Sequence, residues 1–520
     1  LADEEVHIKA HQQVALQASR EGLVLLKNEK GLLPLDKSQI HRIAVCGPNA
    51  DEKSFALTHY GPVAVEVTTV LEGIKQQVKE GTEVTYTKGC DLVDANWPES
   101  EIIHYPLTAA EKEGIQQAVD NVKESDVAVV VLGGGIRTCG ENKSRTSLEL
   151  PGRQQQLLEA IVATGKPVVL VLINGRPLSI NWADKFVPSI LEAWYPGSQG
   201  GTAIAEALFG EYNPGGKLTV TFPKTVGQIP FNFPAKPASQ VDGGQTPGME
   251  GNQSRINGPL YPFGYGLSYT TFEYADLKLS SPVITDKEPV TVTCKVTNTG
   301  SRSGDEVVQL YTRDVISSVT TYEKNLRGFE RVHLEPGETK EVSFQLLPRD
   351  FQLLNKDNHW VVEPGMFQIM IGASSEDIRL KKGLEIRAYG QASANETIES
   401  DPRDFISASK NKSHIIHVVD GDYSTTWKGD KGEYISFELA ENAKVDHIDV
   451  AWKNAEAGSR YEIQISSGGG QFLPVQSGEV KPNQEESIQF NKTGGSDLRI
   501  LITNGSAEIA EIKLPELRKE

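Results

Sequence analysis

Short apolar runs alternate with longer amphipathic segments between residues 42 and 222. The runs are rich in Val, Ile and Leu, and two of them are VAVVVL at 127–132 and PVVLVLI at 167–173. Continuous apolar runs of this length are typical of parallel strands buried on both faces, and the amphipathic segments are typical of covering helices. The pattern therefore predicts an α/β domain with a mostly parallel sheet.

Two segments flank this alternation. Before it, Val14, Ala18 and Leu25 recur at helical spacing, which predicts an amphipathic helix that ends near Asn28. After it, Pro, Gly, Asn and Gln accumulate over about residues 223–262 and the alternation ceases. We expect this second stretch to be a long crossing segment between domains.

The rest of the chain has the period-two pattern of β-strands. From about residue 272 to 388, runs such as VTVTCKVTN, EVVQLYT and MFQIMIG are separated by turn residues, which predicts a β-sandwich. After a polar, Ser-rich stretch, a second all-β block covers about residues 391–520, with runs such as YISFEL, HIDVAW and LRILITN. The composition of the entry stretch predicts that this block is an independent module.

The net charge of the chain limits the kinds of molecule that it can bind. The 520-residue chain carries 52 Lys and Arg against 70 Asp and Glu, a formal net charge of −18 at pH 7. Such a chain repels phosphate groups, so we expect neither nucleic acid nor an anionic membrane as a partner. No apolar run has the length of a membrane span, and the first residues lack an export signal. The four cysteines form no CxxC pair, which favours neither a zinc site nor a disulfide framework.

We expect the chemistry to lie on the loop that follows the predicted strand VAVVVL (127–132). It reads GGGIRTCGENKSRTSLELPG over residues 133–152 and presents Glu141 among Arg137, Lys143 and Arg145. Ligands of open α/β sheets collect at the carboxyl ends of strands, and a carboxylate there is a candidate acid or base. The alternative is a solvated charged loop. The glycines do not fit GxGxxG, and neither GxSxG nor HExxH occurs, so the loop does not favour a nucleotide site, a serine hydrolase or a zinc protease.

Several long segments match a known pattern in the same order. They are GLVLLKNEKGLLPL (22–35), AVCGPNAD (44–51), TGKPVVLVLINGRPL (164–178), EAWYPGSQGGTAIAEALFGEYNPGGKLTVTFP (192–223) and LYPFGYGLSYTTF (260–272). Together they resemble the C-terminal half of glycoside hydrolase family 3. The later segments VTNTGSRSGDEVVQLY and LRGFERVHLEPGET resemble the fibronectin type III-like domain of that family, so the resemblance covers about residues 5–388.

The resemblance implies roles for residues of the 133–152 loop. In this family a β/α barrel supplies an aspartate nucleophile, and a loop of the α/β sandwich supplies the acid/base carboxylate. The family loop commonly reads Glu-x-x-Asp-Arg, and Glu141, Ser144 and Arg145 stand at those positions, with Ser144 in place of the usual Asp. Glu141 is therefore implied as the acid/base. Arg145 is expected either to hold a sugar hydroxyl or to pair with Glu141 and tune its pKa.

The nucleophile is expected to lie outside these residues. The chain has neither a Ser-Asp-Trp nucleophile motif nor the pattern of a β/α barrel, a fold of about 250 residues. We expect the barrel as a partner domain or chain, and we expect the present chain alone to be inactive. No cofactor is expected for catalysis. Trp182 and Trp194 are interpreted as packing residues.

The last block carries a second, shorter resemblance. VVDGDYSTTW (418–427), GEYISFELAENAKVDHIDVAW (432–452) and AEIKL (510–514) resemble discoidin or coagulation-factor type C domains, which include carbohydrate-binding modules. Such domains often hold a structural Ca²⁺, and the resemblance implies the ligands Asp420, Asp422, Thr425 and Glu511. Oxygen-rich turns suit Ca²⁺. The alternative is an Asp-Gly turn without a metal.

The two resemblances together define the expected architecture. We expect a multidomain α/β plus all-β chain, with a lead-in helix and linker at 1–30 and an α/β sandwich at 31–262. A fibronectin type III-like β-sandwich is expected at 263–388 and a discoidin-like β-sandwich of the jelly-roll type at 389–520.

Two functions follow from this architecture. The first is the acid/base portion of a retaining β-glucosidase or β-xylosidase that acts on the non-reducing ends of an oligosaccharide or on an aryl glycoside. The alternative is a non-catalytic carbohydrate-binding protein of several modules. A catalytic role of Glu141 distinguishes them. The resemblance implies a periplasmic or extracellular location.

Overall fold

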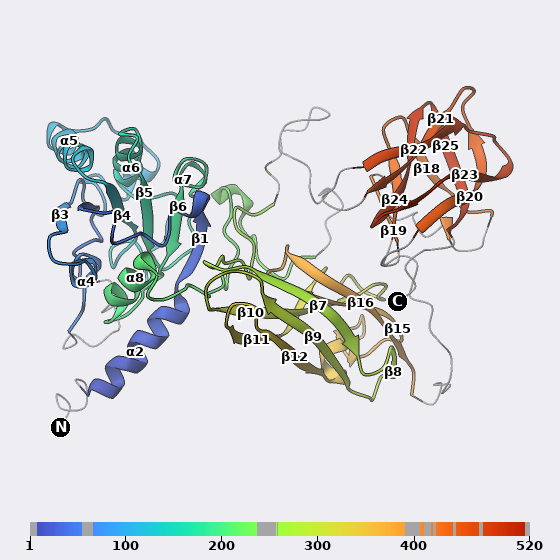
Figure 1. Cartoon of the computed structure of the whole chain (residues 1–520), viewed down its shortest axis with the longest axis horizontal. Coiled ribbons are helices and arrows are strands. Elements are labelled where there is room, and N and C mark those ends of the chain that lie inside the picture. The colour runs from blue at the N-terminus through green and yellow to red at the C-terminus, as the bar shows by residue number, and fades with distance from the viewer. Residues whose placement is uncertain are drawn as a thin grey trace. The chain divides into compact units, whose positions relative to one another are not determined.

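The first domain is built on a six-stranded sheet (Figure 1). The computed structural model describes residues 8–54, 66–236, 256, 258–389, 406–409, 418–419, 423–439, 444–466 and 472–514. The strand order is β1-β6-β5-β4-β2-β3, and β1 is antiparallel to its neighbour while the other pairs are parallel. These strands are β1 (Val24–Asn28), β2 (Arg42–Cys46), β3 (Glu83–Thr87), β4 (Val127–Gly133), β5 (Val168–Ile173) and β6 (Ser189–Glu192). The prediction of a mostly parallel sheet is confirmed.

Helices cover both faces of this sheet (Figure 1). Alternate residues of the central strands pack on α2, α4 and α8 on one face and on α5, α6 and α7 on the other. The helices are α2 (Lys9–Gly22), α4 (Val70–Gln77), α5 (Ala109–Lys123), α6 (Gln154–Val162), α7 (Asn181–Phe186) and α8 (Gly200–Phe209). Short 3-10 helices are η1 (Glu29–Gly31), η2 (Glu99–Glu101), η3 (Val226–Gln228) and η4 (Pro348–Phe351). The continuous apolar strands are explained by this two-sided burial.

Local signals set the starts of two of these helices. Thr69 and Thr108 accept the backbone N–H of Glu72 and Glu111, and each of these Glu side chains accepts the N–H of its Thr in return. Such a capping box satisfies N–H groups that the first turn of a helix leaves without an intrahelical partner.

The N-terminal segment differs from the sequence expectation. The helix ends at Gly22, and the residues that follow form β1, an edge strand whose Val24 pairs with Glu192. Val14 is 69% exposed, whereas Leu25 is fully buried in the sheet. The prediction of a helix to about Asn28 is wrong, because the run LVLL buries more apolar surface as a strand between two helical layers than as one face of a helix. Residues 24–28 thus belong to the α/β sheet rather than to a lead-in segment.

The second domain is a β-sandwich. Its larger sheet has the order β11-β10-β15-β16-β8, its smaller sheet has the order β12-β9-β7, and β13-β14 form a hairpin. The strands are β7 (Phe272–Leu279), β8 (Val283–Thr285), β9 (Val290–Asn298), β10 (Gly304–Asp314), β11 (Asn325–Leu334), β12 (Thr339–Leu346), β13 (Leu353–Leu354), β14 (Trp360–Val361), β15 (Gly365–Gly372) and β16 (Ile378–Arg387). The runs VTVTCKVTN, EVVQLYT and MFQIMIG, predicted as strands, lie in β9, β10 and β15.

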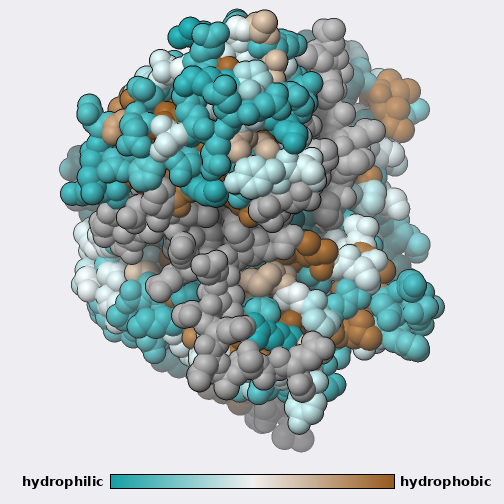
Figure 2. All heavy atoms as spheres, turned by 90° about the vertical axis from the view of Figure 1, so that its right-hand side faces the viewer, coloured by the Kyte–Doolittle hydropathy of each residue, from teal (hydrophilic) through white to brown (hydrophobic). Residues whose placement is uncertain are grey.

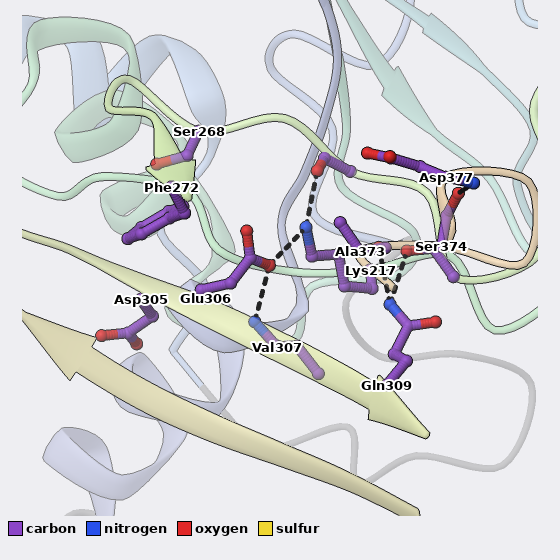
Figure 3. A network of polar contacts seen from close by, with 12 residues as sticks. Lys217, Ser268, Phe272, Asp305, Glu306, Val307, Gln309, Ala373, Ser374 and Asp377 are labelled. Atoms are coloured by element: carbon purple, nitrogen blue, oxygen red, sulfur yellow. Dashed lines mark hydrogen bonds and ion pairs between the residues drawn. The ribbon is translucent and has the colours of Figure 1, made fainter. Parts of the chain in front are cut away.

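A buried ion pair joins the first domain to the β-sandwich (Figure 3). The Lys217 ammonium lies 2.9 Å from Glu306 on β10, and the two side chains are 12% and 4% exposed. Lys217 also donates to the carbonyl of Gly266, and Glu306 accepts the N–H of Val307, at 2.8 Å each. The ammonium thus has two acceptors, and Oε1 of Glu306 has two donors, which helps to offset the desolvation of the buried pair.

The C-terminal block, taken by itself, is a second β-sandwich. Its sheets have the orders β17-β19-β24-β21-β22 and β18-β25-β20-β23. Trp427, Trp452 and Phe437 lie in the core between them. The strands are β17 (Ile406–Ala408), β18 (Trp427–Asp430), β19 (Tyr434–Glu438), β20 (Lys444–Ala455), β21 (Arg460–Ser466), β22 (Phe472–Glu479), β23 (Gln484–Gly494), β24 (Asp497–Asn504) and β25 (Ser506–Lys513).

The face of the molecule in Figure 2 is mostly hydrophilic where residues are coloured, and hydrophobic residues there form small, separate groups. Among the residues that the structure describes, no helix is both long and apolar enough to cross a membrane.

Candidate active site

The loop that carries Glu141 starts at the carboxyl end of β4. Gly133 has φ 128°, and a Cβ there would lie 2.2 Å from the carbonyl oxygen of Ile173 on the next strand, so only glycine fits. The buried Gln154 side chain fixes this turn: its oxygen accepts the N–H of Gly133, and its amide donates to the carbonyls of Gly133 and Leu92. The start of the loop is therefore held rigidly against the sheet.

Arg176 closes the middle of the loop into an arch. Its Nη2 atom donates to the carbonyls of Thr138 and Lys143, at 2.9 Å each. Glu141 lies between these two anchor points, and its side chain is exposed. Gly140 and Asn142 on either side have φ values of 132° and 61°, which turn the backbone sharply around Glu141. The arrangement presents one carboxylate to solvent from a constrained backbone.

The far side of the arch is fixed by a second arginine. Arg145 forms an ion pair with Glu101, and the side chains of Arg145 and Glu101 are 2% and 5% exposed. The guanidinium carbon of Arg145 lies 5.2 Å from the centre of the Trp97 ring. Glu101 also accepts the N–H and the hydroxyl of Thr146 at 2.9 Å each. Burial lowers the pKa of Arg145, and the charge of Glu101 opposes this shift.

The ion pair changes what is expected of Arg145. The partner that the structure gives this side chain is Glu101, and the enclosed guanidinium holds the loop. A contact of Arg145 with a sugar hydroxyl stays a prediction. The sequence analysis missed Glu101 and Arg176, and only Arg176 had a signal, because it stands in the polar NGR that follows a buried strand.

A buried carboxyl group lies at the carboxyl end of β6. Glu192 is fully buried, one of its oxygens accepts the N–H of Trp194 at 2.8 Å, and the Asn174 side chain is within hydrogen-bonding reach. Burial raises the pKa of Glu192 to about 8, because an enclosed carboxylate loses its hydration. In the described part of the chain, Glu192 Oε2 and Asn174 Oδ1 are both buried acceptors without a donor. A proton on Glu192 supplies the missing donor.

We expect this proton to make stability depend on pH. The folded chain keeps it up to about pH 8, whereas the unfolded chain releases it near 4.5. With respect to this group, stability is highest below pH 4.5, falls by about 1.4 kcal/mol per pH unit between these values and stays low above pH 8. Glu192→Gln should raise the free energy of unfolding by about 3 kcal/mol at pH 7. Urea unfolding of the wild type and the variant at pH 5, 7 and 9 measures this gain. A gain that is equal at all three pH values would contradict a protonated Glu192 in the folded chain.

The predicted Ca²⁺ site is only partly within the described residues. Asp420 and Asp422 lie outside them. Thr425 lies in the turn before β18, and Glu511 is buried on β25, where it pairs in register with Ala451. Within the described ranges no group of three or more His, Cys, Asp or Glu could hold a metal. The Ca²⁺ site therefore stays a prediction.

Together, the layers and the loop define a multidomain protein whose α/β domain presents a carboxylate beyond the ends of a parallel sheet. Residues 23–269 match the glycosyl hydrolase family 3 C-terminal domain, residues 306–375 a fibronectin type III-like domain and residues 397–513 an F5/8 type C domain. The chain thus carries the glycosyl hydrolase family 3 C-terminal domain, followed by a fibronectin type III-like domain and an F5/8 type C domain. The expected order of domain types is confirmed.

Relatives and solved structures agree with this assignment. A beta-xylosidase of Formosa agariphila is 44% identical over 71% of this chain and 49% of its own length, and a periplasmic beta-glucosidase of Salmonella typhimurium is 40% identical over 73% and 50%. A β-glucosidase structure from Erythrobacter marinus has a TM-score of 0.65 at 37% identity, covering 73% of this chain and 51% of that one. The chain spans about half the length of the curated relatives it matches.

Proposed function

We propose that this chain is the acid/base-supplying portion of a retaining β-glycosidase, with Glu141 as the acid/base. The observation that carries the proposal is an exposed carboxylate at the top of an arch whose two sides are tied down by Arg176 and Arg145. A general acid needs access to the leaving-group oxygen and a fixed position. An exposed tip on a constrained backbone meets both needs.

The second carboxylate is proposed to come from a β/α barrel outside these 520 residues. Retention needs two carboxyl groups about 5–5.5 Å apart, one that attacks the sugar and one that donates and then removes a proton. We propose that the barrel docks so that its aspartate reaches this distance from Glu141. The present chain alone then binds no reacting sugar at Glu141 and hydrolyses nothing.

Short β-linked glycosides are the proposed substrates. The supporting relatives are named beta-xylosidase and beta-glucosidase, so a terminal xylose or glucose and a variable leaving group are the chemistry to test. The relative named periplasmic beta-glucosidase supports a location outside the cytoplasm.

Restoring the barrel tests the proposal directly. The 520-residue chain is compared with a polypeptide that also contains the barrel, on aryl β-glucoside and aryl β-xyloside. We expect no hydrolysis by the chain alone and hydrolysis by the extended polypeptide. An extended, folded polypeptide without activity on either substrate would favour the non-catalytic carbohydrate-binding alternative.

Arg176 is proposed as a positioning residue for Glu141. In the extended polypeptide, Arg176→Ala frees the carbonyls of Thr138 and Lys143, and a carboxylate displaced by about 1 Å costs about 10²-fold in kcat. The loss in kcat/KM should be larger for poor than for good leaving groups, because a misplaced acid matters most where the leaving group needs a proton, and Arg176→Lys should recover part of it. Amide hydrogen exchange of residues 139–144 in the chain alone should become faster. Unchanged exchange together with unchanged kcat would refute this role.

A further inference from the structure

A cavity of about 410 Å³ lies between the α/β domain and the fibronectin type III-like domain. One side is lined by Trp194, Leu218 and Thr219, and the other by Val307, Leu326 and Phe329. Its volume is within the range of about 300–1,000 Å³ that small-ligand sites occupy, and such sites favour domain interfaces. None of its lining residues comes from the Glu141 loop.

Trp194 is held at this cavity by a strained backbone. Its φ of 55° is rare for a bulky residue and costs on the order of 1–3 kcal/mol. The buried Glu192 carboxyl fixes the turn by accepting the Trp194 N–H. The indole packs edge-on to Phe222 at 5.8 Å and also lines the cavity. The interpretation of Trp194 as a packing residue thus accounts for only part of its surroundings, and the strain itself points to a function.

The two walls offer aromatic surface to a ligand. The Trp194 ring comes from the α/β wall, and Phe329, which is 66% exposed, comes from the opposite domain. Apolar C–H faces of a sugar ring pack well on aromatic rings, which combine a large apolar area with few rotatable bonds. An aromatic side chain on each wall is therefore a fit for a pyranose ring.

Both cations that line the cavity are paired with carboxylates. Arg331 pairs with Asp305 at 3.2 Å and donates to the carbonyl of Glu21, and Lys217 pairs with Glu306. No cation in this part of the described structure is left to attract an anion. The Trp194 indole N–H and the Thr219 hydroxyl have no hydrogen-bond partner among the described residues, and the Glu21 carboxylate is an acceptor.

From this chemistry we propose that the cavity binds a neutral mono- or disaccharide. The aromatic walls take the apolar faces of the sugar, and the indole N–H, the hydroxyl and the carboxylate take its hydroxyl groups. The paired cations and the negative charge of Glu21 disfavour a phosphorylated or acidic ligand, and the polar groups disfavour a purely apolar one. The proposal does not depend on Glu141.

Titration of the full 520-residue chain with cellobiose and xylobiose tests the site. Trp fluorescence and calorimetry follow binding. We expect at least one disaccharide to bind, and Trp194→Ala and Phe329→Ala each to weaken it by about tenfold, the effect of losing one stacked ring. The matched control is Trp360→Ala, because Trp360 is a 67% exposed tryptophan on a hairpin of the same domain and does not line the cavity.

Two outcomes would overturn the proposal. One is no binding of either disaccharide by the wild-type chain. The other is binding that is retained in both Trp194→Ala and Phe329→Ala, which would assign it elsewhere, for example to the C-terminal module. Phe329→Ala should fold like the wild type, because this exposed ring contributes little to the core. A loss of binding in this variant therefore cannot be attributed to misfolding. Glu141→Gln should bind like the wild type, so failure of this proposal is separable from failure of the catalytic one.

Discussion

In the extended polypeptide, Glu141→Gln should lower kcat by about 10²–10⁴-fold on substrates whose leaving group needs a proton. The amide has the shape of the carboxyl group, but it neither donates a proton to the glycosidic oxygen nor removes one from the attacking water. A dinitrophenyl glycoside releases dinitrophenolate, a stable anion that needs no proton. The glycosylation step of this substrate should therefore be slowed much less. The second step, attack of water on the glycosyl-enzyme, also needs the base, so a burst followed by slow turnover is expected. The acidic leaving group thus separates loss of the acid from misfolding.

A matched carboxylate on the same loop provides the control. Glu149 is also exposed, and Glu149→Gln removes one charge from the loop while it keeps the backbone carbonyl that accepts a hydrogen bond from Arg145. We expect its kcat and its pH profile to equal those of the wild type. The assignment of Glu141 fails if both variants behave alike, or if Glu141→Gln lowers kcat/KM, which reports the glycosylation step, equally for the two classes of leaving group.

The second large effect is expected at the domain contact in Figure 3, where Lys217→Met leaves Glu306 buried without its cation. Removal of one partner of a buried pair costs about 3–5 kcal/mol, because the remaining charge keeps its desolvation penalty. Val307 still donates one hydrogen bond to Glu306, which does not replace an ammonium at 2.9 Å. Urea unfolding at pH 7 should show this loss in the transition of the first two domains.

A double variant and a surface pair complete this experiment. Lys217→Met combined with Glu306→Leu removes both charges and should recover most of the lost stability. Lys295 and Asp276 form an exposed pair at 2.6 Å, and Lys295→Met should change stability little, because solvent screens such pairs. Equal losses in Lys217→Met and Lys295→Met would show that burial does not decide the effect.

The sequence predicted strands well where hydrophobic periodicity was strong. VTVTCKVTN coincides with β9 at residues 290–298, and VAVVVL at 127–132 lies within β4. It failed at residues 24–28, where an apolar run fits either a helix face or a buried strand and only the neighbour β6 decides. Pairing across 161–168 residues leaves no periodic signal in either segment.

The sequence named Glu141 and Arg145, from their loop after a buried strand and from a family motif, and their roles stay proposals. It did not name the residues that hold them. Glu101 is 44 residues from Arg145, and Arg176 is 38 and 33 residues from its two acceptors. Those acceptors are backbone carbonyls, which every residue has, so no residue type in the sequence marks them.

The sequence by itself determined the order of the domains, the parallel sheet and the position of the proposed acid/base, since these depend on periodicity and on local motifs. The tertiary structure decided what holds Glu141, why Glu192 keeps a proton and which residues enclose the cavity at Trp194. The physical reason is that hydration, charge pairing and enclosure depend on neighbours in space. Folding brings those neighbours together from distant parts of the chain, and the local pattern does not record them.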